Sequence, residues 1–191
     1  MLRTNPSLLQ FMELMYSRQE QPHIGLKQFT PGSFLVQQGA VATKVYIIKD
    51  GITKCFISEE NGKDFIFEFL SSGEIVGDLE AIRNIRYLCN IRAITNVQTY
   101  SIDIAQFRRL MEKDPQLSNL LIHELAERVI NTSIRTSSQH TYTLDHALRK
   151  LLELQSRQGL SFAKEDLADY LGITLRSLNR ALKNLGETAG E

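Results

Sequence analysis

The hydrophobic periodicity of this chain changes near residue 104, and that change limits the folds it can adopt. Between about Ile24 and Ile104, short apolar runs are separated by recurring turn pairs, namely Pro31-Gly32, Gln38-Gly39, Asp50-Gly51, Asn61-Gly62 and Ser72-Gly73. Within one run Phe65, Phe67 and Phe69 alternate, so we expect all three on one face of a half-buried strand. Short strands at this spacing predict an antiparallel sandwich or barrel.

Beyond residue 104 the period becomes helical. From Pro115 to Arg135 there is no glycine or internal proline, and apolar residues recur mostly every three or four positions: Leu117, Leu120, Leu121, Leu125, Val129 and Ile134. This pattern predicts one long amphipathic helix. The polar run 136–141 is expected to be a hinge, because Ser and Thr side chains compete for backbone hydrogen bonds. A second helix is expected from Asp145, as its N-cap, to about Gln158, where Gly159 ends it.

Composition narrows the functional classes. The formal net charge of the 191 residues is zero, so any nucleic-acid site must be a local one. Two cysteines, Cys55 and Cys89, are too few for a disulfide framework, which fits a reducing cytoplasm. The chain shows neither a signal-peptide pattern nor an apolar run near the roughly 18 residues of a membrane span, so we expect a cytoplasmic protein without membrane contact.

Chemistry-bearing motifs of enzymes are missing from the sequence. It contains no nucleophile–base arrangement, no metal-ligand motif and no phosphate-transfer loop. We therefore expect a protein that is not an enzyme and has neither catalytic residues nor a metal site.

The segment from Phe162 to Leu185 carries the strongest functional signal. Residues 164–171 and 175–185 are expected to form two short helices, with Gly172 as the stop between them. Ala168, Gly172 and Leu178 have the spacing of a helix-turn-helix: the small residue allows a close crossing, Gly adopts the left-handed turn, and Leu178 fills the angle between the helices.

The second of these helices has the charge of a DNA reader. Between Thr174 and Leu185 it carries three basic residues and no acidic one, a local charge of +3. Such a helix can place side chains on base edges and phosphates in a major groove. The alternative is a packed helix pair that binds no DNA. The residues predicted to bind DNA are Thr174, Leu175, Arg176, Ser177, Asn179, Arg180 and Lys183.

Residues from about 24 to 185 together resemble the cyclic-AMP receptor protein/FNR (CRP/FNR) family of bacterial transcription regulators. Besides the helix-turn-helix, the resemblance is carried by Phe29-Thr30-Pro31-Gly32, Gln38-Gly39, Tyr46-Ile47-Ile48 with Gly51, Gly77-Asp78-Leu79 and Asp114-Pro115. It implies an α+β fold with an N-terminal jelly-roll effector domain, a long dimerisation helix and a C-terminal winged helix-turn-helix. The partners implied are a second copy of the chain (a homodimer), palindromic double-stranded DNA and RNA polymerase.

The resemblance also divides the chain. Residues 1–113 would form the effector-sensing β-barrel, 114–136 the dimerisation helix, and 137–191 the DNA-binding domain. Dimerisation is expected through an apolar stripe with four-residue spacing, Leu117, Leu121, Leu125 and Val129, unless that stripe packs only on its own barrel. The family continues into a β-hairpin wing where this chain has the tail 186–191, which contains no apolar strand. We therefore expect the wing to be missing.

On the recognition helix, the family's pattern places an arginine, a glutamate and a second arginine against the bases. The matching positions here are Leu175, Arg176 and Arg180, so the resemblance keeps only the last. Arg180 is then the expected bidentate reader of guanine, Arg176 a base or phosphate contact, and Leu175 an apolar contact such as one to a thymine methyl group. Lys183 is expected to act on phosphate.

The resemblance places an effector pocket around the stretch GEIVGDLEAI, residues 73–82. Its candidate residues are Gly77, Asp78, Leu79, Arg86, Tyr87, Leu88, Cys89, Thr132 and Ser133. In cyclic-AMP-binding members an arginine–serine pair grips the cyclic phosphate. Here the matching positions hold Tyr87 and Leu88, or in a shifted register Leu88 and Cys89. Neither register supplies the pair, although Arg83 or Arg86 could substitute.

Two further positions match residues that contact the ribose and the adenine of cyclic AMP in the family. Asp78 stands where the family's ribose-binding glutamate is expected, and Thr132-Ser133 match a threonine–serine pair that touches adenine. Because the groups that grip the phosphate are absent, we expect an effector other than cyclic AMP. Its identity stays open, as do the operator sequence and the choice between activation and repression.

The cysteines and histidines give little support for the other effector types of the family. Two cysteines cannot supply the four thiolates of an iron–sulfur cluster, although Cys55 or Cys89 could instead sense oxidation. The histidines are scattered and are expected to be solvated or capping rather than haem ligands: His23, His123, His140 and His146. The alternative function is an effector-binding or protein-interaction module without DNA binding.

Overall fold

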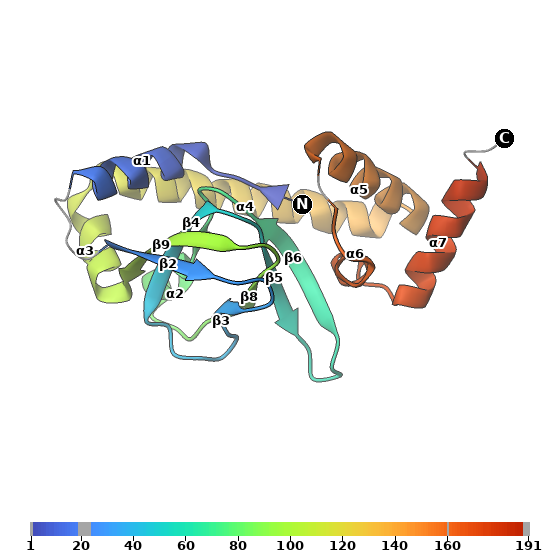
Figure 1. Ribbon diagram of the computed structural model, residues 1–191, viewed down its shortest axis with the longest axis horizontal. Helices are drawn as coiled ribbons and strands as arrows, with labels where there is room; N and C mark the ends of the chain where they lie inside the picture. The colour runs from blue at the N-terminus through green and yellow to red at the C-terminus, as the bar shows by residue number, and fades with distance from the viewer. Residues whose placement is uncertain (1, 19–23, 160, 189–191) are drawn as a thin grey trace.

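The computed structural model describes residues 2–18, 24–159 and 161–188, and it has a β-rich body with a helical unit at one end (Figure 1). The strands are β1 (Leu2–Arg3), β2 (Ile24–Phe29), β3 (Phe34–Val36), β4 (Lys44–Asp50), β5 (Thr53–Ser58), β6 (Asp64–Leu70), β7 (Ile75–Val76), β8 (Asn90–Ala93) and β9 (Val97–Asp103). The helices are α1 (Pro6–Ser17), α2 (Asp78–Arg83), α3 (Ile104–Lys113), α4 (Pro115–Thr141), α5 (Leu144–Gln158), α6 (Lys164–Leu171) and α7 (Leu175–Thr188).

The body consists of two sheets, as the spacing of the turn signals predicts. One has five strands in the order β1-β6-β5-β8-β3, and the other has four in the order β2-β9-β4-β7. All pairings are antiparallel except that of β1 with β6. A buried cluster joins the two sheets, with Tyr46 and Val97 from the smaller sheet and Leu70 and Ile91 from the larger. The β-rich N-terminal part of the fold class is therefore confirmed.

Strand β6 departs from the predicted alternation. Cys55 pairs with Glu68 and Phe56 with Ile66, so Phe67 is the extra residue of a β-bulge. The bulge reverses the alternation, and Ile66 and Phe69 are fully buried while Phe67 is exposed. The prediction that Phe65, Phe67 and Phe69 share one face is wrong, because a period of two holds only where every residue is paired.

The long helix α4 begins as predicted and ends later. Asp114 is its N-cap, accepting hydrogen bonds from the backbone N–H groups of Gln116 and Leu117. It then runs straight through the predicted hinge to Thr141. The hinge prediction is wrong for a local reason: the Thr141 hydroxyl donates to the carbonyl of Ser137, so this side chain does not compete for the helical N–H groups. The chain bends instead before α5, whose N-cap is Thr143 rather than the predicted Asp145.

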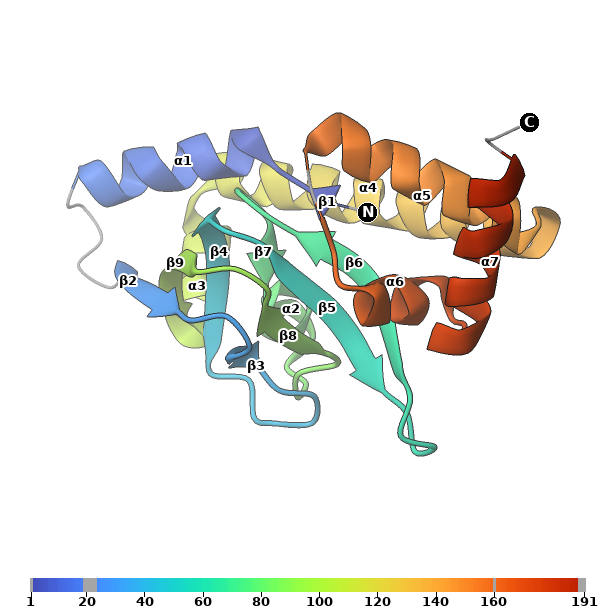
Figure 2. The same ribbon diagram turned by 45° about the vertical axis from the view of Figure 1, so that its right-hand side comes forward.

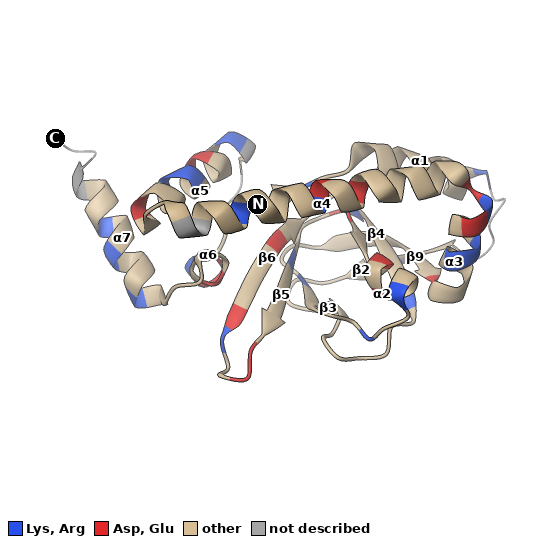
Figure 3. Cartoon of the chain, turned by 180° about the vertical axis from the view of Figure 1, so that it is seen from behind, with Lys and Arg blue, Asp and Glu red and all other residues tan. Residues whose placement is uncertain are grey.

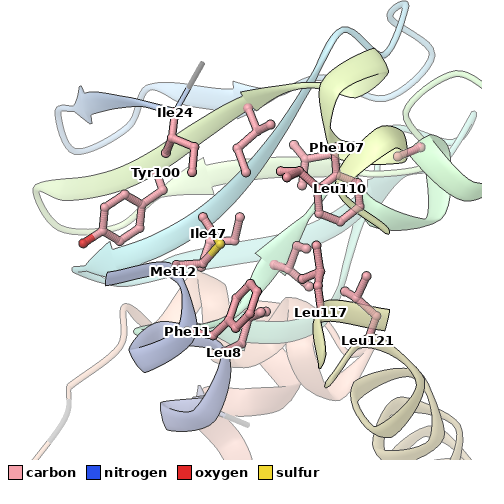
Figure 4. Packing of buried hydrophobic residues seen from close by; sticks show 14 of the residues in the cluster. Leu8, Phe11, Met12, Ile24, Ile47, Tyr100, Phe107, Leu110, Leu117 and Leu121 are labelled. Atoms are coloured by element: carbon pink, nitrogen blue, oxygen red, sulfur yellow. The ribbon is translucent and has the colours of Figure 1, made fainter. Parts of the chain in front are cut away.

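A second buried cluster lies on the other face of the four-stranded sheet, between that sheet and the helices that cover it (Figure 4). There Leu8 and Met12 of α1, Phe107 of α3 and the first turns of α4 pack against strand residues such as Ile47. Leu117 and Leu121 belong to this cluster and are almost fully buried in their own chain. These two residues therefore cannot contact another subunit, which corrects half of the predicted dimerisation stripe.

Helices α5, α6 and α7 form the helical unit, which packs on the end of the body next to β6 (Figure 2). The Phe69 ring stacks on Phe162 and on Tyr170, with ring centroids 4.0 and 5.6 Å apart. An ion pair between Lys54 of β5 and Asp166 of α6 adds to the contact. The described residues from Leu175 onward form α7 and contain no strand, so the missing wing stays a prediction.

The bulge in β6 receives a side chain of α4 at this junction. The Arg135 guanidinium donates to the carbonyls of Phe67 and Ile66, and also to the carbonyl of Tyr170 in α6. It lies over the Tyr170 ring at 4.0 Å from the centroid. One side chain thus joins the long helix, the barrel and the helix-turn-helix.

Among the described helices, including α4, none is long and apolar enough to cross a membrane.

Candidate recognition helix and effector pocket

The turn between α6 and α7 has the geometry that the sequence predicts. Gly172 adopts a left-handed conformation with φ 69°, and its N–H group caps α6 at the carbonyls of Ala168 and Asp169. Ala168, Leu178 and Ala181 are buried between the helices. These contacts confirm the predicted packing residues and fix the direction of α7.

The first turn of α7 uses two of the predicted DNA-binding residues for its own support. The Thr174 hydroxyl oxygen accepts a hydrogen bond from the backbone N–H of Ser177 at 3.2 Å, and the two hydroxyl groups lie 3.0 Å apart. This is the arrangement of an N-cap. Thr174 and Ser177 thus hold the start of the helix in place, and any contact they make with DNA comes in addition.

The other predicted DNA-binding residues line the outer face of α7. Arg176, Asn179, Arg180 and Lys183 are exposed, and Leu175 is more than one third exposed. Their three- and four-residue spacing places them along one side of the helix. Figure 3 shows the resulting basic bands on α7, at the far end of the molecule from the barrel helices. The structure therefore brings these side chains together on one accessible face.

In the predicted effector pocket, Tyr87 fills the space beside the Gly77 turn. The Gly77 backbone has φ 90°, and a Cβ there would lie 2.7 Å from the Lys44 carbonyl and 3.5 Å from the Tyr87 ring. Tyr87 is only 7% exposed. Its hydroxyl donates to the Lys44 carbonyl at 2.7 Å and accepts from the Lys44 N–H at 3.2 Å. The Lys44 backbone makes the close approach that requires glycine, and the Tyr87 ring packs beside the turn in ordinary contact.

Asp78 also has an internal partner. Its carboxylate is 2% exposed and lies 2.9 Å from the guanidinium of Arg128 on α4. Arg128 donates in addition to Glu124 and to the carbonyl of Ile75, each at 2.9 Å. Burial alone would lower the pKa of Arg128, but the carboxylates of Asp78, Glu124 and Glu74 raise it above its usual value. Arg128 therefore stays charged and holds the acid that the resemblance assigns to a ribose.

The same charge network continues toward the N-terminus. Arg3 forms ion pairs with Glu124 and with Glu74, the latter at 3.5 Å. Glu74 is 1% exposed. Burial and repulsion from Glu124 raise its pKa to about 7, although Arg3 and Arg128 act in the opposite direction. The cluster thus has three carboxylates and two guanidinium groups in close contact.

Sequence reasoning missed the basic members of this network. The one local signal was the four-residue spacing of Glu124 and Arg128 on a helix, which favours an ion pair. The partners Arg3 and Asp78 lie far from these residues in sequence, so no period could connect them.

The remaining predicted pocket residues point in several directions. Arg86 is exposed and donates to the Gly39 carbonyl, while Arg83 is exposed on α2. Leu88 is 48% exposed, and its N–H donates to Glu80. Of the residues on α4, Thr132 is exposed and the Ser133 hydroxyl donates to the Val129 carbonyl. Leu79 is partly exposed, and Cys89 contacts Cys55.

A cavity of about 650 Å³ lies elsewhere, between β6, α4, α5 and α6. Arg135, Tyr142, His146 and Tyr170 are among its lining residues, and no predicted pocket residue is. His146 stacks on Tyr142, with ring centroids 4.4 Å apart, whereas His23 lies outside the described residues. In the part of the chain that the structure describes, no group of three or more His, Cys, Asp or Glu side chains could hold a metal ion.

Comparisons with known proteins agree with this architecture. Residues 26–114 match the family model of the cyclic nucleotide-binding domain. The cAMP-activated global transcriptional regulator CRP of Salmonella typhimurium is 22% identical over 96% of this chain and 88% of the relative. The c-di-GMP responsive global regulator CLP of Xanthomonas campestris has a similar fold, with TM-score 0.78 at 17% identity over 88% of this chain and 89% of that one.

A transcriptional regulator of the crp/fnr family from Eubacterium rectale superposes equally well. Its TM-score is 0.78 at 16% identity, and the match covers 95% of this chain and 87% of the other. At such identities the structural likeness establishes the fold. Because the match covers 95% of this chain, the shared fold includes the barrel, the long helix and the helical unit.

Proposed function

Because the chain belongs to the CRP/FNR family of transcription regulators, we propose that it works as a homodimer that reads a palindromic operator with α7 and responds to an effector other than cyclic AMP. The observation that carries the proposal is the outer face of α7. There Arg176, Arg180 and Lys183 are exposed on a helix whose opposite face is buried. A helix presented in this way can enter a major groove without rearrangement of its own unit.

Within this proposal the side chains of α7 have different tasks. Arg180 makes a bidentate contact to guanine, and Arg176 contacts a base or a phosphate. Leu175 offers only an apolar contact, so the operator differs from the site of the cyclic-AMP receptor protein. Lys183, farther along the helix, neutralises a phosphate and adds to affinity for any sequence.

The dimer interface is proposed on the outer side of α4. With Leu117 and Leu121 buried in their own chain, the predicted stripe keeps Leu125 and Val129, of which Val129 is 66% exposed. Ile122, Ile130 and Ile134 are also exposed on this helix. A series of apolar side chains along one exposed helix is the pattern of a surface that pairs with a partner. Residues 1–113 would then sense the effector and residues 137–191 bind DNA, with α4 between them.

The pocket residues support the part of the proposal that concerns the effector. A cyclic phosphate would need a cation and a hydroxyl once it left water. Tyr87 instead occupies the Gly77 turn with its own hydrogen bonds, and Asp78 is paired with Arg128. Cyclic AMP could enter only by displacing buried groups that already have partners.

The test is a selection of binding sites from random duplexes, followed by fluorescence anisotropy at several salt concentrations. The wild type should select a palindrome and bind it with a strong salt dependence. Arg180→Ala should lose about 1–3 kcal/mol per half-site and relax the preference at one base pair of each half-site.

The matched control is Lys113→Ala on α3, at the opposite end of the molecule from α7 in Figure 1. It removes the same charge and should change neither the motif nor the affinity. If the motif and its sharpness are the same with Arg180→Ala as with the wild type, Arg180 does not read bases. A wild type that selects nothing would favour the alternative, a module that binds an effector or a protein partner but no DNA.

A further inference from the structure

The two cysteines of the chain are in direct contact. Cys55 lies in β5, and Cys89 lies in the bend that precedes β8, 34 residues further along the chain. Their sulfur atoms are 3.2 Å apart, and the Cys55 thiol donates a hydrogen bond to the Cys89 sulfur. Strands β5 and β8 are neighbours in the five-stranded sheet, with Phe56 opposite Asn90. The contact is therefore fixed by strand pairing and does not depend on a mobile side chain alone.

The geometry leaves little movement between this contact and a covalent bond. A disulfide has a sulfur–sulfur distance of about 2.05 Å, so the two atoms would have to approach by about 1.2 Å. Cys55 is held inside the sheet between β6 and β8. Cys89 is placed in an irregular segment, next to the half-exposed Leu88, where the backbone can adjust.

We propose that Cys55 and Cys89 form an oxidative modification site, at which a hydroperoxide converts the two thiols into an intramolecular disulfide. The Cys89 sulfur attacks the peroxide oxygen; the S–O bond forms, the O–O bond breaks, and the leaving oxygen departs as water when the peroxide is hydrogen peroxide. The Cys55 sulfur then attacks the sulfenic acid on Cys89, the S–S bond forms, and the S–O bond breaks with release of water.

Electrons and atoms balance in this sequence. The two thiols give up two electrons and two protons, and one hydrogen peroxide takes them up and becomes two water molecules. The order of the two steps follows from the surroundings of the sulfur atoms. The hydrogen bond to Cys89 and burial raise the pKa of the Cys55 thiol, so this residue stays protonated and serves as the resolving partner. Both cysteines are partly exposed, and Cys89 is the one next to the exposed Leu88, so the first step is placed there.

The disulfide would tie β5 to the segment that carries the pocket residues. Residues 84–88 between α2 and Cys89 include Tyr87, which fills the Gly77 turn. Strand β5 pairs with β6, whose bulge holds Arg135 of α4. The bond therefore closes a covalent loop of residues 55–89, which contains Gly77, Asp78 and Tyr87. It ties this loop to the sheet on which the helical unit packs. It is a property of the barrel and does not depend on DNA binding.

The experiment uses the full-length reduced protein and one equivalent of hydrogen peroxide. Because the chain has two cysteines, a thiol titration reports the site without background. We expect both thiols to disappear together, with the loss of two hydrogen atoms from the intact mass and a Cys55–Cys89 cross-linked peptide after non-reducing digestion. Oxidation should also raise the melting temperature by about 5–10 °C, because the bond restricts the unfolded chain.

Two variants separate the steps. With Cys55→Ser, Cys89 should stop at the sulfenic acid, which dimedone traps, and with Cys89→Ser the remaining thiol should react much more slowly. If either variant fails to fold, peptide mapping of the oxidised wild type still decides the matter. The proposal is overturned if both thiols survive, if the cross-links formed are between chains, or if Cys89 proceeds to a sulfinic acid without a link to Cys55.

Discussion

Two polar side chains in the barrel are buried and paired within the chain, whereas those on the outer face of α7 are exposed. In the barrel, Asp78 and Tyr87 stand where the resemblance predicts an effector pocket, but both are buried and bonded to groups of the same chain. On α7, Arg176 and Arg180 extend from a helix whose apolar face is buried. The comparison teaches that a retained backbone does not imply a retained ligand. Gly77 adopts its left-handed turn against the Lys44 carbonyl, and the ring of Tyr87 packs beside it.

This contrast has an energetic side. The barrel groups contribute to stability, since a buried charge is tolerated only with a partner. The exposed guanidinium groups of Arg176 and Arg180 on α7 contribute little to folding. Variants of these barrel groups should change the free energy of unfolding, whereas variants of Arg176 or Arg180 should change affinity for DNA and leave stability nearly unaltered.

The largest effect is expected from Arg128→Ala, which leaves Asp78 and Glu124 buried without their cation. Removal of one partner of a buried ion pair costs about 3–5 kcal/mol. Chemical denaturation of variant and wild type measures the difference. Arg83→Ala, on the exposed side of α2, is the control and should stay within about 0.5 kcal/mol of the wild type. A loss below about 1 kcal/mol for Arg128→Ala would show that Asp78 has no need of an internal partner.

The next effect depends on pH and concerns Glu74, whose pKa is raised from 4.5 to about 7 in the folded protein. The folded state therefore keeps a proton that the unfolded chain releases, and this contribution to stability is present at low pH and lost as the pH rises through 7. Between about pH 5 and pH 8 the loss amounts to about 2–3 kcal/mol.

Glu74→Gln has no proton to release. The free energy of unfolding of this variant, relative to that of the wild type, should therefore rise by about 2–3 kcal/mol between about pH 5 and pH 8. Chemical denaturation at each pH measures the difference. The exposed Glu60→Gln is the control for removal of a surface carboxylate. A difference between Glu74→Gln and the wild type that does not change with pH would mean that Glu74 is ionised throughout.

A smaller effect is expected at the subunit interface. Val129→Glu places a carboxylate in the proposed apolar contact and should weaken dimerisation by about 10–100-fold, without loss of the monomer's fold. Sedimentation equilibrium measures the dissociation constant. Gln116→Glu adds the same charge to an exposed position in the first turn of α4, about 20 Å along the helix from Val129, and should leave the dimer intact. Unchanged dimerisation of Val129→Glu, or a monomeric wild type, would place the interface elsewhere or remove it.

How much the sequence could reveal differs between these regions. The helix-turn-helix depends on residues within one short segment, so the spacing of Ala168, Gly172 and Leu178 predicted it correctly. The start of α4 was equally local, because Asp114 caps its own helix. Such elements follow from neighbouring residues alone.

Features that depend on distant residues could not be predicted in this way. The bulge at Phe67 arises from pairing with β5, and it reverses a strand face that looked regular in sequence. The pairing of Asp78 with Arg128 joins residues 50 positions apart. The burial of Leu117 and Leu121 depends on α1 and α3, which both precede them in the sequence and pack in the same buried cluster. An apolar stripe shows that a face is buried but not which surface buries it.

The most direct test measures binding of cyclic AMP to the barrel and binding of DNA to α7 in the same titration. Cyclic AMP is added to the wild type while its dissociation constant for the selected duplex is followed by anisotropy, and a parallel calorimetric titration records binding of the nucleotide itself. We expect salt-dependent DNA binding that changes by less than about twofold, with no saturating heat, because the barrel groups already have partners within the chain. Nucleotide binding in the low micromolar range together with DNA binding that tightens about tenfold or more would contradict this account.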